Sequence, residues 1–286
     1  MSAADFAIVT VTYSGDIKPF ADLCASIDRH MPGVTHHVIV DRAEQHQFVR
    51  FATVQRRVHV AEDFLPPSWQ VRFRGKRYRF LPITPPIRGW IWQQLVKLSF
   101  SASASEKALV LIDSDALFIK PLSADQIIRG NRVRLYRSPA GTAAPRHSQW
   151  RKTACRVLGL PMQDFDGADY ISTAVTWSPE VAKALLARIT QQTRLPWYMP
   201  LCWRMRFSEY MLYGIFCEAA APELSDRVYL ENRELCHCSW HYRLDESDVE
   251  QFHRDIKPHH VAVLIQSNLS MPEQTRRRIL AGFTER

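Results

Sequence analysis

Two carboxylates one residue apart, Asp113 and Asp115, follow an uninterrupted apolar run from Ala108 to Ile112. Such a run is typical of a buried strand, and open α/β sheets bind ligands at the carboxyl ends of their strands. Side chains alternate along an extended chain, so Asp113 and Asp115 can point the same way and share one divalent cation. The pattern indicates a hard-ion site suited to a diphosphate, with a polar turn after a strand as the alternative.

A second segment, Arg88 to Leu98, precedes that strand and carries Trp, Gln and Lys side chains on one face of a predicted helix. Together with Asp113-x-Asp115 and Ser208-Glu209-Tyr210, it resembles the GT-A class of nucleotide-sugar-dependent glycosyltransferases, and more narrowly a little-characterised bacterial group of that class. The resemblance extends over roughly residues 6 to 270. It implies a GT-A-like (Rossmann-like) mixed α/β sheet flanked by helices in a single domain.

The resemblance also implies where the donor would bind. In that class the loop after the first strand and an acidic residue ending the second strand hold the nucleoside, and the matching positions are Thr12, Tyr13 and Asp41. From the residues alone, Tyr13 could equally pack in the interior, and Asp41 could serve as a turn or helix cap.

The polar face of the helix from Arg88 to Phe100 would look into the sugar-nucleotide pocket in the same class. Gln93 or Gln94 would then bind hydroxyl groups of the donor, and Lys97 would neutralise a phosphate. A solvated helix face is the alternative interpretation.

The resemblance makes Mn²⁺ or Mg²⁺ the expected cofactor. Asp115 would be the direct ligand, and Asp113 would reach the ribose or a metal-bound water. Related enzymes often add a histidine from the C-terminal part, for which His237 and His241 are the candidates. A zinc site at Cys236-His237-Cys238 is disfavoured, because alternate residues of an extended segment diverge.

Glu209 follows Ser208, a residue suited to cap a helix. A carboxylate in the first turn of that helix corresponds to the general base in inverting members of the class, so the resemblance implies a catalytic role for Glu209 beside Asp115. A glutamate at this position could instead only complement the helix dipole.

The elements that must position these residues begin with a strand from Phe6 to Val11. Phe20, Leu23, Cys24 and Ile27 then give a helix one apolar face, and Thr35 to Val40 is a second strand. A strand, helix and strand in this order predict a right-handed βαβ unit. The first strand is not followed by Gly-x-Gly-x-x-Gly, which argues against a dinucleotide-binding enzyme.

Two further segments combine aromatic and basic residues. Residues 71 to 80 alternate and turn at Gly75-Lys76, which predicts a hairpin with one apolar face and a basic remainder. We favour a solubilising hairpin over a cationic arm for an anionic acceptor or lipid head group. Residues 194 to 207 could form a lid over the acceptor, a patch touching the inner leaflet, or buried packing.

The whole chain has 286 residues, a net charge of +8 and a pI near 9.3. The length fits one domain, with a nucleotide-sugar-binding half of about residues 1–122 and an acceptor-binding half of about 123–286. The charge favours anionic partners such as nucleoside diphosphates, anionic glycolipids or a membrane surface. No nucleic acid partner is expected, because the basic residues are dispersed and no nucleic-acid-binding motif is present.

The start of the sequence lacks the features of a signal peptide, and no apolar run approaches the roughly 18 residues of a membrane span. We therefore expect a cytoplasmic protein with reduced, mostly buried cysteines and a peripheral contact with the inner membrane.

The function that follows is transfer of a sugar from a nucleoside diphosphate donor to a hydroxyl of a cell-envelope glycan or glycolipid, with a metal ion assisting. A nucleotidyltransferase of similar fold, or a non-catalytic glycan- or nucleic-acid-binding protein, is the alternative.

Overall fold

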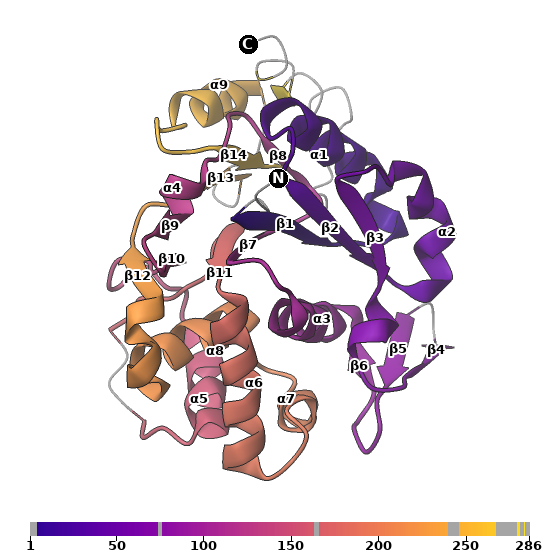
Figure 1. Ribbon diagram of the computed structural model, residues 1–286, viewed down its shortest axis with the longest axis vertical. Helices are drawn as coiled ribbons and strands as arrows, with labels where there is room; N and C mark the ends of the chain where they lie inside the picture. Colours follow the sequence, from indigo (N-terminus) through magenta and orange to yellow (C-terminus); the bar gives the residue numbers. More distant parts are fainter. Residues whose placement is uncertain are drawn as a thin grey trace.

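The centre of the computed structural model is a five-stranded sheet in the order β11-β7-β1-β2-β3 (Figure 1). The structure describes residues 5–73, 76–162, 166–239, 246–266, 279–280 and 283. Strands β1 (Phe6–Val11), β2 (Thr35–Val40), β3 (Arg56–Val60) and β7 (Ala108–Ile112) run parallel, and β11 (Ala174–Trp177) is antiparallel to β7. The predicted mixed α/β sheet is confirmed.

Helices cover both faces of this sheet because its central strands are apolar on both sides. Ala7 and Val9 of β1 belong to the core shared with α3 (Gly89–Ser103), whereas Phe6 and Ile8 belong to the core shared with α1 (Ile17–His30). Further helices extend the α3 side: α5 (His147–Leu158), α6 (Pro179–Thr193), α7 (Tyr198–Arg204) and α8 (Glu209–Ile215).

Three small sheets surround the central one. The first has the order β13-β14-β8 (Cys236–Cys238, Ala262–Leu264, Ala116–Phe118), the second β12-β10-β9 (Val228–Glu231, Arg132–Tyr136, Ile128–Arg129), and the third β4-β5-β6 (Trp69–Phe73, Lys76–Phe80, Ile87–Arg88). The remaining described helices are α2 (Gln45–Phe48), α4 (Ala124–Ile127) and α9 (Glu246–Arg254). Short 3-10 turns lie at Ser14–Asp16, Arg42–Glu44, Val49–Phe51, Ala61–Phe64 and Pro222–Arg227, and a π-helical turn at Phe216–Ala220.

The chain changes sheets at the Asp113–Asp115 turn. It leaves the central sheet at the end of β7 and enters β8, which pairs with β14. The N–H of Ile265, just after β14, donates to the carbonyl of Asp115 at 3.4 Å. The turn is therefore fixed from two sheets at once.

The elements agree with the sequence expectations at β1, β2 and α1, where Phe20, Leu23, Cys24 and Ile27 are all buried. The six cysteines are free and buried, as expected. Among the described residues, no helix has both the length and the hydrophobicity that crossing a bilayer requires.

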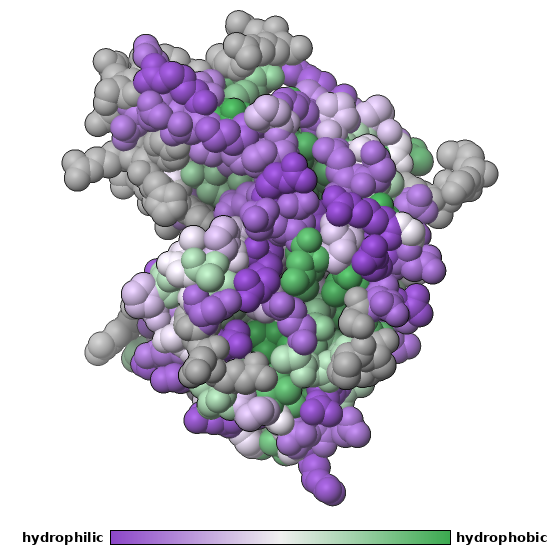
Figure 2. All heavy atoms as spheres, turned by 90° about the vertical axis from the view of Figure 1, so that its left-hand side faces the viewer, coloured by the Kyte–Doolittle hydropathy of each residue, from purple (hydrophilic) through white to green (hydrophobic). Residues whose placement is uncertain are grey.

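The surface on the side of β9, β12 and α4 is mainly hydrophilic, with a hydrophobic strip in its lower half (Figure 2). The β4–β5 hairpin lies at the opposite edge of the molecule (Figure 1).

A close approach between α8 and the segment before β11 gives a stability prediction. A Cβ at Gly214 would lie 2.0 Å from the ring of Tyr170, so Gly214→Ala should lower the free energy of unfolding by about 1–3 kcal/mol despite alanine's better helix propensity. Gly89→Ala is the matched control, because nothing lies within 4 Å of its Cβ position. Urea unfolding of both variants measures the difference, and equal stability would contradict this packing.

Candidate functional site

A cavity of about 270 Å³ opens where β1 and β7 end. Its wall is built from the last residue of β1, the turn after β7, the polar face of α3 and the first turn of α8. The predicted site residues that line it are Gln93, Gln94, Lys97, Asp113, Asp115 and Glu209. These predicted residues come from α3, the turn after β7 and the start of α8, so the fold brings three separate segments together at one cavity.

The ammonium group of Lys97 is at the centre of this arrangement. Its Nζ lies 3.2 Å from Asp113 Oδ1 and 3.3 Å from Glu209 Oε1, and it donates to the hydroxyl of Tyr210 at 2.8 Å. Burial by itself favours the neutral amine, but the nearby negative charges, with Asp113 the strongest, hold the pKa of Lys97 well above its ordinary value. Lys97 is therefore a buried cation whose three donors already have partners.

Glu209 begins α8, as predicted, and is held in place from both sides. The hydroxyl of Ser208 accepts a hydrogen bond from the N–H of Met211, and the side-chain oxygen of Gln94 accepts one from the N–H of Glu209 at 3.0 Å. Burial raises the pKa of Glu209, while the charge of Lys97 acts in the opposite direction. Gln94 therefore positions the start of α8, and its expected role of binding a donor hydroxyl stays a prediction.

The two carboxylates of the central turn face the cavity, and the residue between them has a different role. The side chain of Asp113 is 45% exposed, so only part of it is taken up by Lys97. The hydroxyl of Ser114 donates to Asp16 Oδ2 at 3.0 Å. Asp16, from the loop after β1, also lines the cavity, and only its place in a turn-forming cluster could have indicated it in the sequence.

The loop after β1 lies beside the cavity, but its predicted site residues, Thr12 and Tyr13, are not among the residues that line it. The ring of Tyr13 covers Gly15 so closely that a Cβ there would lie 2.3 Å from it. Thr12 is buried, and its hydroxyl makes no hydrogen bond with any described residue. The buried carboxylate of Glu44 fixes the loop by accepting from the N–H of Ser14 at 2.8 Å and from its hydroxyl at 2.9 Å.

Asp41 does not reach the cavity. Its carboxylate accepts a hydrogen bond from Trp92 Nε1 at 2.9 Å and forms an ion pair with Arg79. Burial raises its pKa, and Arg79 and Trp92 oppose that shift. The acidic residue that ends β2 therefore ties β5 to α3, and the structure does not place it with the residues expected to hold the nucleoside.

Of the two histidines expected to complete a metal site, His237 does not line the cavity that holds the two aspartates. His237 lines a separate, open cavity of about 570 Å³, where its ring lies against those of Phe252 and His260. His241 lies outside the described residues. Within the described ranges, no group of three or more His, Cys, Asp or Glu side chains is arranged to hold a metal ion.

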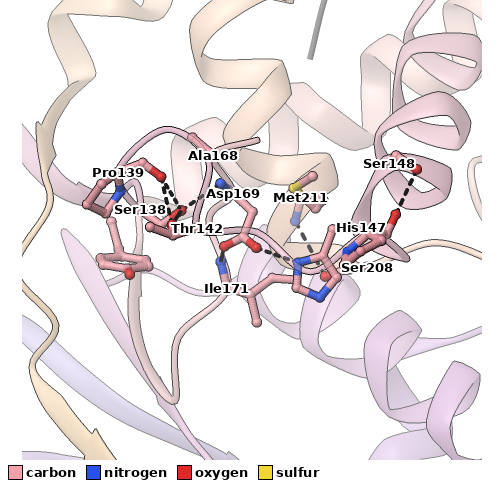
Figure 3. A network of polar contacts seen from close by, with 12 residues as sticks. Ser138, Pro139, Thr142, His147, Ser148, Ala168, Asp169, Ile171, Ser208 and Met211 are labelled. Atoms are coloured by element: carbon pink, nitrogen blue, oxygen red, sulfur yellow. Dashed lines mark hydrogen bonds and ion pairs between the residues drawn. The ribbon is translucent and has the colours of Figure 1, made fainter. Parts of the chain in front are cut away.

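An aromatic wall, defined by Trp90 and Trp150, also borders the cavity; Trp90 lies on the polar helix face that the sequence indicated, whereas Trp150 was not expected there. Both side chains line the cavity, and their ring centroids are 5.9 Å apart. The ring of His147 stacks on Trp150 at 4.6 Å, and Figure 3 shows His147 directed at Asp169, with which it forms an ion pair. No pattern in the sequence around Trp150 indicated that it would lie beside Trp90.

The carboxylate of Asp169 joins this wall to the loop before β11. Its Oδ1 accepts from the N–H of Ile171 at 3.0 Å, and its own N–H donates to the hydroxyl of Ser138 at 2.9 Å (Figure 3). The same group thus orients His147 and fixes Ile171, which lines the cavity.

The buried cation gives a second stability prediction. Lys97→Met removes the partner of two carboxylates, so the free energy of unfolding at neutral pH should fall by about 3–5 kcal/mol. The contribution of Lys97 is present at neutral pH and is lost only as the pH rises through its raised folded-state pKa. Lys152→Met, at an exposed position of α5, is the control. An unchanged stability for Lys97→Met would contradict the buried ion cluster.

Comparisons with known proteins bear on the family and the fold of this chain. A family model described as a family of unknown function (DUF6492) matches residues 6–286. A search of curated proteins finds no match. The galactosyltransferase LgtC, solved with donor and acceptor sugar analogs, aligns with a TM-score of 0.51 and 9% identity over 97% of this chain and 96% of LgtC. At that identity the likeness shows the fold alone, and it confirms the predicted GT-A-like fold.

Two other solved structures align less well. Mouse xyloside xylosyltransferase 1 gives a TM-score of 0.49 and 10% identity over 93% of this chain and 99% of that one. The glycosyltransferase GlyE of Streptococcus pneumoniae TIGR4 gives 0.48 and 9% identity over 96% of this chain and 60% of that one.

Proposed function

The chain belongs to the DUF6492 family of unknown function, for which we propose a function from the site of this member: it is a nucleotide-sugar-dependent glycosyltransferase. It transfers a sugar from a nucleoside diphosphate to a hydroxyl of a cell-envelope glycan or glycolipid. The observation that supports this proposal is the meeting of Lys97, Asp113, Asp115 and Glu209 in one cavity of a GT-A-like fold.

The two aspartates suit a divalent cation bound together with a diphosphate. Carboxylates and a diphosphate repel one another unless a cation lies between them. Mg²⁺ is commonly held by one or two protein carboxylates together with phosphate oxygens, so Asp113 and Asp115 fit Mg²⁺ or Mn²⁺ without a third protein ligand. When bound, such an ion would stabilise charge on the departing diphosphate.

Lys97 acts through the carboxylates. Because its donors are taken up by Asp113, Glu209 and Tyr210, it fixes one oxygen of Asp113 and leaves the other for the donor side. We therefore propose that Lys97 positions the carboxylates of Asp113 and Glu209, and that it does not itself neutralise a phosphate of the donor. Gln93 is the residue of the polar α3 face that we assign to a donor hydroxyl.

Glu209 is the proposed general base. It takes the proton of the acceptor hydroxyl as the acceptor oxygen forms a bond to the anomeric carbon and the bond from that carbon to the diphosphate breaks. Burial raises its pKa above that of an ordinary glutamate, which makes it a stronger base, and the charge of Lys97 opposes that shift and favours the carboxylate form. This route inverts the anomeric configuration.

The aromatic wall supports a carbohydrate acceptor. Trp90 and Trp150 offer flat apolar surfaces at the cavity, which suit the apolar face of a sugar ring. A glycolipid acceptor would require the enzyme to work in the cytoplasm at the surface of the inner membrane.

Metal-dependent nucleotide binding tests the central turn. A panel of nucleoside diphosphates should raise the melting temperature of the wild type in the presence of Mn²⁺ and should have little effect in excess chelator. Asp115→Asn should abolish the metal-dependent part of this shift, because a direct ligand is lost, and should leave the melting temperature without ligand nearly unchanged.

The matched control is Asp125→Asn, at an exposed position of α4. The metal site would be refuted by full sugar transfer in excess chelator, or by a metal-dependent shift that survives in the Asp113→Asn/Asp115→Asn double variant.

The role of Glu209 is tested by Glu209→Gln. Nucleotide binding should persist, while kcat should fall by at least about 10²-fold through loss of the base. The wild-type rate should decline as the pH falls through the raised pKa of Glu209, at a higher pH than for an ordinary glutamate. A normal rate, or a product that retains the donor's anomeric configuration, would leave Glu209 a structural residue.

A further inference from the structure

The β4–β5 hairpin turns its apolar face to solvent. Trp69, Val71 and Phe73 lie on one face of β4 because they are two residues apart, and they are 56%, 46% and 61% exposed. The cross-strand partner of Trp69 is Phe80, and the two rings stack at 5.6 Å with an interplanar angle of 3°. Tyr78, opposite Val71, adds to the same face. We call these five residues the aromatic face.

The opposite face of the hairpin is charged and points into the protein. Arg79 is 5% exposed, forms ion pairs with Asp41 and Glu62, and lies 4.1 Å from the centre of the Trp92 ring. Arg77 pairs with the buried carboxylate of Glu44. The expected pairing of two strands is confirmed, but Arg77 and Arg79 bind the body of the protein, whereas Trp69, Val71 and Phe73 are exposed.

An exposed apolar face of this kind requires an explanation. Scattered exposed apolar residues are normal, but contiguous ones mark surfaces that bind something. Reversing the hairpin would bury the aromatic side chains, yet the carboxylates of Glu44, Asp41 and Glu62 hold the present orientation. The fold thus maintains the aromatic face in water by ion pairs on the other side.

We propose that the aromatic face docks on the interfacial layer of an anionic lipid bilayer. Trp and Tyr are favoured at that interface, where one part of the ring is apolar and the other is hydrated. Charge complementarity supports the same occupant. Residues 69 to 80 contain no Asp or Glu, and besides Arg77 and Arg79, which pair with the protein body, they contain Arg72, Arg74 and Lys76. The whole chain carries +8. An anionic membrane surface attracts such a segment within about a Debye length.

The position of the hairpin links this surface to the cavity. Strand β5 pairs with β6, and β6 leads directly into α3, which supplies Trp90, Gln93 and Lys97 to the cavity. Exposed apolar residues continue into the loop after β5, where Ile83 is 78% exposed and its carbonyl accepts a hydrogen bond from Trp203 Nε1 at 3.0 Å. Docking would therefore hold the β5–β6–α3 segment close to lipid-borne molecules.

Cosedimentation with vesicles tests the proposal without any sugar transfer, so its result does not depend on the proposed enzyme activity. The wild type should bind vesicles of phosphatidylcholine with about one-third phosphatidylglycerol, and should bind phosphatidylcholine vesicles at least about tenfold more weakly. Trp69→Ser/Val71→Ser should weaken binding to the anionic vesicles by about tenfold or more, and Trp69→Tyr should retain most of it.

The matched control is Met162→Ser/Leu230→Ser, which removes two apolar side chains of similar exposure, 58% and 50%, from other parts of the surface. It should bind as the wild type does, and urea unfolding should show that both double variants are folded. Equal binding by the two double variants, or equal binding of the wild type to neutral and anionic vesicles, would overturn the proposal.

Strand β4 is also the edge of its sheet, so a second copy of the chain could pair with it. Light scattering after size exclusion distinguishes this case. A wild-type dimer that Trp69→Ser/Val71→Ser converts to a monomer would show that the aromatic face binds another copy and would overturn membrane docking.

Discussion

The arrangement of the cavity depends on one buried ammonium group. Lys97 is charged although it is buried, because Asp113 and Glu209 lie within 3.3 Å of it. Desolvation of such a cation costs several kcal/mol unless its partners are held in good geometry, and the same holds for a buried carboxylate. The three groups therefore require one another, and α3, α8 and the strand β7 that precedes the Asp113 turn are packed on one hydrophobic core that holds them in place.

The same principle operates near the start of α3, at Trp92, with a different outcome. Arg79 joins β5 to Asp41 at the end of β2 and lies over the ring of Trp92 in α3. These contacts fix the β4–β5 hairpin with its charged face inward and thereby determine that its aromatic side chains face outward. Around Lys97 buried charge shapes a cavity for chemistry, whereas around Arg79 it presents an apolar surface to the outside.

The two aspartates of the central turn receive their orientation from two sheets. β7 ends in the central sheet and β8 begins in another, while Ser114 is tied to Asp16 and the Asp115 carbonyl to Ile265. Both side chains can then face the cavity with little reorganisation. Such preorganisation is what a site for a diphosphate and a divalent cation needs, because binding energy is not used to order the ligands.

The sequence by itself determined the elements and much of the candidate site. Apolar periodicity located β1, α1, β2 and β7, because it reports burial directly, and the apolar run before Asp113 located the strand end that borders the cavity. Only the tertiary structure decided the partners of charged groups. In the structure Asp41 forms an ion pair with Arg79, and the side chain of Gln94 accepts a hydrogen bond from the N–H of Glu209. His237 lines a separate cavity, and the ring of Trp150 lies beside that of Trp90. Whether a charged residue is exposed, paired or catalytic depends on residues that are distant in the sequence and close in space, and a local sequence pattern does not show which residues those are. The hairpin illustrates the reason: its alternation defined two faces, but the carboxylates that selected the inner face come from other elements.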